Sequence, residues 1–379
     1  MPHGQPSLIF MKLRPSEGVV LASMAVLALI LANTRFAPLY FKLINTSLWP
    51  SGFSLSAACR DGLMSLFFLY IGLEFNYELK SGRLSDLKTL KLPMACALGG
   101  MVVPALIYCL INWGHGLKGF GVPMATDIAF SLALYAAVGK HLSPDLRVFL
   151  LSLAIVDDIL SLIILGLFYG QPMSVLTLWP ILLMCMALWL LRYVSHRLYD
   201  VAFLLVSLIG FALSLKLGLS LSLSALIFAA FVPPAAAKRL IKTLHGLVHG
   251  LILPLFAFVS VGISFTALGL TSLISAPCLG VALGLSLGKF IGIAGVSYGL
   301  IRLGFTTLPQ GVSPSHLNYT ALLCGIGFTM SLYMAELASS SPIEQGQLKL
   351  GILLGSCLSA LIGGIGLARS AKQPSVNHQ

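Results

Sequence analysis

The stretch VFLLSLAIVDDILSLIILGLF, residues 148–168, decides the fold. It is long and apolar enough to cross a bilayer as a helix, yet two adjacent carboxylates, Asp157 and Asp158, lie near its centre. A central Asp costs about 2.5 to 3.5 kcal/mol on insertion, whereas each Leu, Ile, Val or Phe returns only about 0.3 to 0.6 kcal/mol. Acidic residues at such depth normally face a cavity or a partner and mark the path of an ion or a proton. We interpret the pair as a functional site; a packed, neutral, hydrogen-bonded pair is the alternative.

The whole chain has the composition of a membrane protein. Hydrophobic residues make up 58% and charged residues 9% of its 379 residues, and the mean hydropathy is +0.96, which is more apolar surface than a soluble domain can bury. We predict an all-α polytopic membrane protein with about 12 transmembrane helices. The apolar stretches are residues 18–35, 55–73, 93–112, 122–139, 148–169, 174–193, 201–215, 219–235, 247–267, 275–299, 317–338 and 347–368.

The basic residues predict the orientation of these spans. Lys and Arg are concentrated in the N-terminal arm, in the connections after even-numbered spans and in the tail, so we expect both termini in the cytoplasm. The expected organisation is a cytoplasmic arm (1–17), a single transmembrane domain (18–368) and a cytoplasmic tail (369–379). The net charge of +11 is therefore a signal of topology, and no basic run with interleaved aromatics indicates a nucleic-acid partner.

Three more charges lie deep in apolar stretches. They are Asp61 in CRDGLMSLFFLYIGLE, Asp127 in GVPMATDIAFSL and Lys289 in LGLSLGKFIGIAG. Each needs a partner in a low-dielectric interior. Two alternatives stay open: Lys289 could extend to a membrane interface, and Asp61 could form a purely local ion pair with the adjacent Arg60.

Two spans contain residues that interrupt a helix. Gly119, Gly121 and Pro123 precede Ala-Thr-Asp in the fourth span, and Gly325 and Gly327 lie within CGIGFTMS in the eleventh. These residues favour unwound backbone, which hydrocarbon tolerates only where it lines a cavity. For CGIGFTMS, a simple glycine packing face between helices is the alternative.

The interruptions predict an internal repeat. If residues 93–169 and 275–368 are two repeats, the fourth and eleventh spans occupy equivalent places, as in transporters with inverted repeats whose binding site lies between discontinuous helices. Crossing half-helices would leave their positive N-termini and negative C-termini in low dielectric. Asp127 and Lys289 carry the charges needed to offset those ends.

Five motifs carry a resemblance to a known family. ATDIAF (125–130), LAIVDDI (153–159), LILPLFAF (251–258), GKFIG (288–292) and LLCGIGFTMS (322–331) resemble the NhaA family of sodium/proton antiporters, in the same order and at similar spacing. The resemblance covers about residues 18–368. It implies electrogenic, pH-regulated exchange of sodium or lithium ions for protons across a bacterial inner membrane, with no cofactor.

The resemblance implies roles by position. Asp157 and Asp158 match the acidic pair that binds sodium or lithium and exchanges it for protons. Thr126 and Asp127 match the unwound stretch beside that pair, with Thr126 as a further candidate ligand. Lys289 matches a lysine that neutralises helix ends and pairs with the first acidic residue when no sodium is bound.

Other matched positions concern exchange and its control by pH. Asp61 matches an acidic position that affects exchange, and Glu74, Glu78 and His245 match positions that set the pH response. Four departures from the family pattern predict an altered pH profile. Tyr77 and Ser220 stand where the family often has a basic residue and a histidine, and Ile241 and Ser260 stand where it often has a glutamate and an asparagine. The loop of residues 33–52 is short beside the family's dimerising β-hairpin, which leaves a homodimer open.

The chemistry of these residues predicts that a cation and protons compete for the aspartate pair. Carboxylates are hard oxygen ligands suited to a hard cation, and neighbouring carboxylates titrate as a coupled pair. We expect Asp158 to be the indispensable ligand and Asp157 a second ligand and proton carrier. A proton-coupled porter of another cation or of a small organic solute is the alternative function. An enzyme is not expected, because no Gly-x-Gly-Asp occurs, Ser161 breaks a DDxxD pattern and GKF lacks the other residues of a phosphate-binding loop.

Overall fold

The computed structural model describes most of the chain and contains only helices and connecting turns there. The described residues are 15–47, 54–81, 87–138, 142–169, 175–191, 202–203, 205–207, 209–210, 212–213, 216, 221–308 and 311–370. Within them the one β-type contact is an isolated bridge between Ser47 and Ser54. The predicted all-α class is confirmed.

Helices (α) and short 3₁₀ or π-helical segments (η) follow one another along the chain. They are α1 (Pro15–Ala32), α2 (Ala37–Asn45), α3 (Leu55–Ala57), η2 (Ala58–Leu63), α4 (Met64–Ser81), α5 (Leu87–Ile111), η4 (Lys118–Met124), α6 (Ile128–Val138), α7 (Pro144–Ile164), η5 (Leu165–Tyr169), α8 (Val175–Leu190), α10 (Leu221–Phe231), α11 (Pro234–Leu247), η7 (Val248–Ile252), α12 (Leu253–Ser260), α13 (Phe265–Leu268), η8 (Leu270–Ile274), α14 (Ala276–Leu283), η9 (Gly284–Gly288), α15 (Lys289–Arg302), α16 (Pro314–Leu323), α17 (Phe328–Ala338) and α18 (Pro342–Ser370).

Several of these elements can cross a membrane. In the described part of the chain, seven helices are long and apolar enough, or up to nine if each of two bent helix pairs is one span. Two predicted spans appear as shorter apolar helices, α8 and α10, and the predicted span 201–215 lies mostly outside the described residues. The multi-pass membrane class is confirmed, and the count of twelve stays a prediction.

One predicted boundary is wrong. The apolar pattern placed the ninth span at residues 247–267, whereas the helix runs continuously from Pro234 to Ser260. Apolar windows skip the basic segment around Lys238, Arg239 and Lys242, but Ala, Leu, Lys and Arg are good helix formers, and Pro234 begins the helix at its first turn. Most of the predicted arm (1–17) and tail (369–379) lies outside the described residues.

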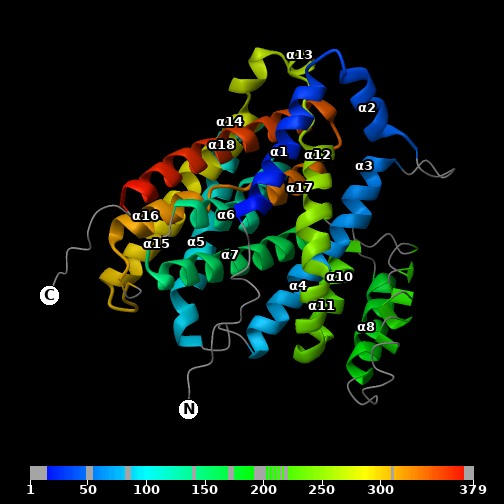
Figure 1. Cartoon of the computed structure of the whole chain (residues 1–379), viewed down its shortest axis with the longest axis vertical. Coiled ribbons are helices and arrows are strands. Elements are labelled where there is room, and N and C mark those ends of the chain that lie inside the picture. Colours follow the sequence, from blue (N-terminus) through cyan, green and yellow to red (C-terminus); the bar gives the residue numbers. More distant parts are fainter. Residues whose placement is uncertain are drawn as a thin grey trace. The chain divides into compact units, whose positions relative to one another are not determined.

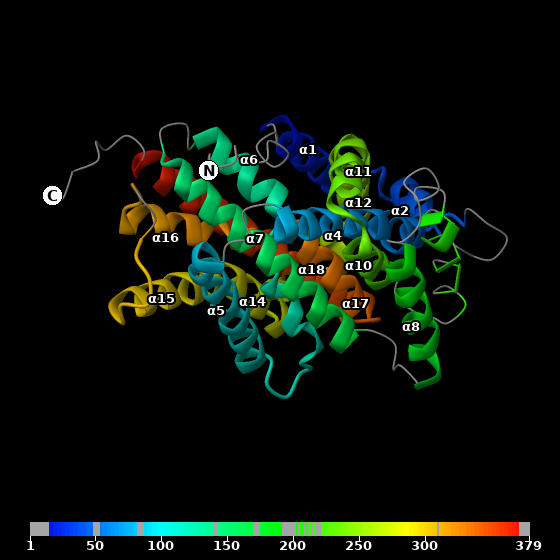
Figure 2. The same cartoon turned by 90° about the horizontal axis from the view of Figure 1, so that it is seen from below.

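Chain packing divides the protein into two compact units. The first unit comprises Met1–Met11, Phe41–Ser85 and Leu165–Val259. In it α4 lies beside α10 and α11 (Figure 2). The Asn76 amide on α4 donates to the carbonyl oxygens of Ala229 and Val232, each at 2.7 Å, which satisfies groups left free where α10 ends.

The second unit comprises Lys12–Tyr40, Asp86–Ile164 and Ser260–Gln379. It contains a sequence of three elements twice: α5, the broken span η4–α6 and α7, then α14–η9–α15, the broken span α16–α17 and α18. The second broken span is bent by 43° at its interruption. α18 lies beside α14 (Figure 1), α5 packs on α15, and η4 packs on α17.

Glycines bring α5 and α15 into backbone contact. A methyl group added at Gly292 would lie 2.2 Å from the Gly99 carbonyl oxygen, and one added at Gly99 would lie 2.5 Å from the Gly292 oxygen. Small residues allow helices in a membrane to approach this closely. The contact holds the start of α15, where Lys289 lies, against α5.

We expect Gly292→Ala to destabilise the protein by about 1 to 3 kcal/mol, because the added methyl forces two backbones apart. Sodium dodecyl sulfate titration, followed by circular dichroism, measures the change. Gly295→Ala on the same helix is the control, because a methyl there would meet nothing within 4 Å. Equal unfolding midpoints for Gly292→Ala and the control would contradict the role of this contact.

Candidate cation site

The two broken spans of the second unit meet at their breaks. The Asp127 N–H donates to the Ile326 carbonyl oxygen at 2.7 Å, and the Thr126 hydroxyl donates to the Cys324 carbonyl oxygen at 2.8 Å. A side chain is excluded at Gly325 in the second break, because a methyl group there would lie 2.3 Å from the Leu285 carbonyl oxygen. The glycines of CGIGFTMS therefore lie where two unwound backbones cross, and not only on a packing face between two helices.

Hydroxyl groups satisfy carbonyl oxygens that the breaks release. Ser131 on α6 donates to the Leu323 carbonyl oxygen at the end of α16, at 3.0 Å. In the reciprocal contact, Ser331 on α17 donates to the Val122 carbonyl oxygen near the end of η4, at 2.7 Å. Each span thus caps the carbonyl end of the other. Neutral hydroxyls therefore bond these carbonyl ends, and the role of Lys289 in neutralising helix ends stays a prediction.

Asp127 lies at the positive ends of two half-helices. One carboxylate oxygen accepts the Phe130 N–H of α6, at 3.0 Å. The other accepts both the N–H of Thr329, at 3.0 Å, and the Thr329 hydroxyl. The residue is 2% exposed, and its charge stands where two helix N-termini converge. The position agrees with the predicted offset of helix ends, and it commits both oxygens to α6 and α17.

Asp157 and Lys289 form an ion pair shielded from solvent. The Lys289 Nζ donates to Asp157 Oδ2 at 2.6 Å, and neither side chain has any exposed surface. Lys289 therefore does not extend to a membrane interface. Lys289 begins α15 directly after the π-helical segment η9, and Gly100 on α5 leaves room for Ile293 on the next turn of α15, where an added methyl would lie 2.8 Å from the Ile293 side chain.

Oxygen atoms gather around this pair. Asp158 follows Asp157 on α7 and is 1% exposed. Among the described residues, Asp157 Oδ1 has no hydrogen-bond partner of good geometry. The buried Ser161 hydroxyl, one turn further along α7, also has none. Thr126 lies close to the Asp157 carboxylate. The structure thus brings Lys289 and Thr126 to Asp157, Asp158 follows Asp157 on the same helix, and Asp127 occupies the same break as Thr126.

Sequence reasoning missed the hydroxyl residues Ser131, Thr329 and Ser331. A signal was available, because each stands within an otherwise apolar segment directly after a break, in AFSL or GFTMS. Hydroxyls at such positions can satisfy backbone groups that leave a helix.

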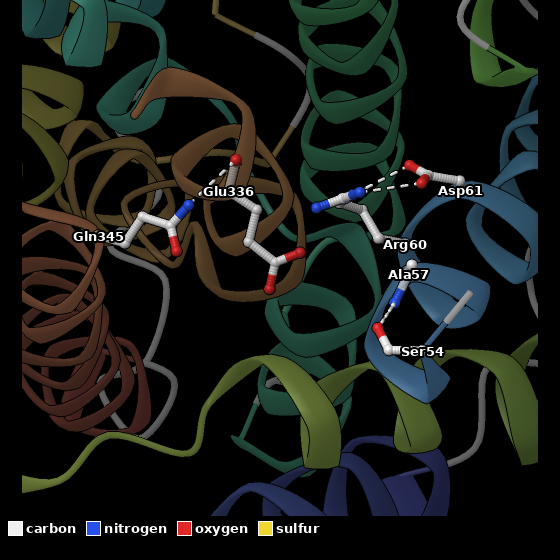
Figure 3. A network of polar contacts seen from close by, with 6 residues as sticks. All are labelled: Ser54, Ala57, Arg60, Asp61, Glu336 and Gln345. Carbon is white, nitrogen blue, oxygen red and sulfur yellow. Dashed lines mark hydrogen bonds and ion pairs between the residues drawn. The ribbon is translucent and has the colours of Figure 1, made fainter. Parts of the chain in front are cut away.

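Asp61 belongs to the first unit. It lies in η2, where both of its carboxylate oxygens accept hydrogen bonds from the Arg60 guanidinium, at 2.9 Å each (Figure 3). Both side chains are about one-third exposed, at 34% for Arg60 and 37% for Asp61. The local ion pair that the sequence left open is therefore present.

The predicted pH-response residues also lie in the first unit. The Tyr70 hydroxyl donates to Glu74 on α4 and lies 3.5 Å from the Nδ1 atom of His245 on α11. The His245 and His249 rings are 4.6 Å apart, centre to centre. Glu78 is buried on α4, Tyr77 is half-buried, and Ser220 lies outside the described residues. The spacing of four residues between His245 and His249 already paired the two histidines in the sequence, whereas Tyr70 was not predicted as a member of this cluster.

The geometry of the second unit defines what the site can do. A fully buried lysine occupies one carboxylate of an aspartate pair, and hydroxyl oxygens stand nearby. Such an arrangement can hold one positive charge in place of another, because charges in a dry interior need partners. Sulfur and imidazole ligands are not among these predicted site residues, which favours a hard cation.

Comparisons with known proteins agree with this chemistry. The model of the family described as Na+/H+ antiporter 1 matches residues 9–367. The Na(+)/H(+) antiporter NhaA of Aliivibrio salmonicida is 40% identical over 367 residues, covering 93% of this chain and 95% of the relative. The protein of that name in Rhodospirillum rubrum is 38% identical over 395 residues, covering 98% and 99%. The one in Aeromonas hydrophila is 38% identical over 376 residues, covering 94% of each chain. The chain therefore belongs to the Na+/H+ antiporter 1 family.

Proposed function

We propose that the protein is a sodium/proton antiporter that uses the Asp157–Asp158 pair as its exchange site. The observation that carries the proposal is the ion pair between Lys289 and Asp157, at 2.6 Å with both side chains fully buried. A carboxylate pair held in this way can accept sodium only when another positive charge leaves. Family membership and the relatives' names support sodium and protons as the two competing cations.

The charges of the site set the exchange. When sodium binds, Asp158 and Asp157 offer it oxygen atoms, and Lys289 must give up Asp157 or lose its proton. If binding of one sodium ion releases two protons, each cycle moves one net charge and the exchange is electrogenic. Alternating access then converts this competition into outward flow of sodium and inward flow of protons.

The crossing supplies a fixed frame for this exchange. Asp127 is held by Phe130 and Thr329, so we assign it a positioning role at the helix ends, with Asp157 and Asp158 as ligands and Thr126 as a further oxygen donor. Lithium is a second substrate in this proposal, because it is also a hard monovalent cation. No observation favours a porter of another cation or of an organic solute.

The remaining proposals concern the location of the protein in the cell and the control of its activity by pH. We propose a bacterial inner-membrane protein with both termini in the cytoplasm, consistent with the basic residues of the cytoplasmic connections. We also propose that the cluster of Tyr70, Glu74, His245 and His249, together with Glu78, adjusts activity to pH, and that Asp61 affects exchange.

We expect Asp157→Asn and Asp158→Asn each to abolish sodium-dependent proton release, because the amide keeps the shape but loses the negative charge that holds the cation. Everted membrane vesicles with a fluorescent pH indicator report the exchange. Asp145→Asn is the matched control, because Asp145 lies in the first turn of the same helix and is exposed. Full activity of either test variant would refute the exchange site.

Competition also predicts how the apparent KM for sodium depends on pH. Raising the pH by one unit should lower this KM about tenfold if one proton competes and about a hundredfold if two do, with an unchanged maximal rate. The slope, measured in proteoliposomes driven by a sodium gradient alone, therefore reports the number of competing protons. A KM that does not change with pH would show that protons and sodium do not share the site. Parallel runs with lithium and potassium test the cation range.

A further inference from the structure

One face of α18 carries polar residues along the half-helix α17. Gln345, Lys349, Ser356 and Ser359 are spaced by 4, 7 and 3 residues, which places them on one stripe of a helix with 3.6 residues per turn. The apolar residues Leu354, Leu358, Leu361 and Ile365 lie outside this stripe and are exposed. The polar stripe thus faces the interior of the second unit, where α17 packs on α18.

The stripe reaches the N-terminus of α17. This half-helix begins after Gly327, which has no side chain to cap it. Its first N–H groups are bonded from elsewhere: the Ser356 hydroxyl accepts the Phe328 N–H at 3.4 Å, next to the Thr329 N–H that Asp127 accepts. The buried Ser359 hydroxyl lies against Gly325, where a methyl group would meet it at 2.4 Å. α18 therefore contacts the break itself.

The stripe also reaches the C-terminus of α17. The Gln345 amide donates to the carbonyl oxygen of Ser339, at 2.6 Å. It also donates to the carbonyl oxygen of Glu336, at 3.3 Å, a contact drawn in Figure 3. The Lys349 ammonium forms an ion pair with the Glu336 carboxylate at 3.3 Å, with 14% and 8% of the side chains exposed. A positive charge and an amide donor near a helix C-terminus stabilise it.

We infer that Gln345, Lys349 and Ser356 are positioning residues for cation exchange. α17 has 11 residues and so spans about 16 Å, which makes it a short rigid connection between its two ends. By holding both ends, α18 sets where the Thr329 N–H meets Asp127, and hence how the crossing presents Thr126 to Asp157. The inference rests on the proposed sodium/proton exchange. It adds residues outside the aspartate pair that determine sodium affinity.

The test uses full-length protein and separates affinity from rate. Ser356→Ala and Lys349→Met should each raise the apparent KM for sodium about three- to tenfold, the factor expected for one lost hydrogen bond, with less change in maximal rate. Cys357→Ala and Gln347→Ala are matched controls. Cys357 is exposed next to Ser356, and Gln347 lies between Gln345 and Lys349 off the stripe. Both controls should keep the wild-type KM.

A second measurement does not depend on transport. In detergent, hydrogen exchange of the peptide containing Phe328 and Thr329 should be faster in Ser356→Ala and Lys349→Met than in wild type and controls. Ser356→Thr and Lys349→Arg keep the hydroxyl and the charge, and should keep both the KM and slow hydrogen exchange. These conservative variants also decide the question if a more severe variant fails to fold.

The outcomes separate this inference from the proposed function. Absence of sodium-dependent proton movement in the wild type would overturn the proposed function, and hydrogen exchange would still test the link between α18 and α17. Folded Ser356→Ala and Lys349→Met variants with wild-type KM and wild-type hydrogen exchange would overturn the inference. A lower maximal rate at unchanged KM would also overturn it, because that pattern indicates a general structural defect.

Discussion

A backbone that unwinds inside a membrane must find a partner for each N–H and C=O group that it releases, because hydrocarbon offers none. In this protein two unwound segments find partners in each other. Asp127 donates its N–H to Ile326, Thr126 donates to Cys324, and the serines of α6 and α17 bond carbonyl oxygens of the opposite span. The breaks can exist only together, so the second unit is organised around their crossing.

The two kinds of helix end at the crossing are stabilised differently. The positive N-termini of α6 and α17 share a full negative charge, that of Asp127. The carbonyl ends of η4 and α16 receive neutral hydroxyls, which leaves the charge of Lys289 for Asp157. In the exchange that we propose, this division matters because a lysine fully committed to backbone carbonyls would not be available to compete with an incoming cation. The crossing thus frees one positive charge for the aspartate pair.

The buried aspartate pair depends on distant parts of the chain for a compensating charge, because burial of a carboxylate is costly. Asp157 has no exposed surface, and its partner Lys289 comes from a helix that is 132 residues away in the sequence. The glycine contact between α5 and α15 holds the helix that carries Lys289. The polar stripe of α18 contacts the start of α17, at the crossing of the two broken spans. Affinity for a cation in such a site is therefore a property of helix packing as well as of the ligands.

The sequence alone determined the all-α membrane class and the interruptions of the fourth and eleventh spans, and it singled out Asp127, Asp157, Asp158 and Lys289 as candidate site residues. Charged residues and helix breakers are easy to recognise within apolar spans, because burying them in a membrane costs free energy that the neighbouring residues in the sequence do not offset. Only the tertiary structure decided which groups meet. Lys289 could have extended to an interface, Asp61 could have had a distant partner, and Ser131, Thr329, Ser331 and Ser356 are ordinary residues until the fold brings backbone groups to them. Hydrogen bonds between distant segments depend on backbone positions to a fraction of an ångström, and residue spacing along one chain does not contain that information.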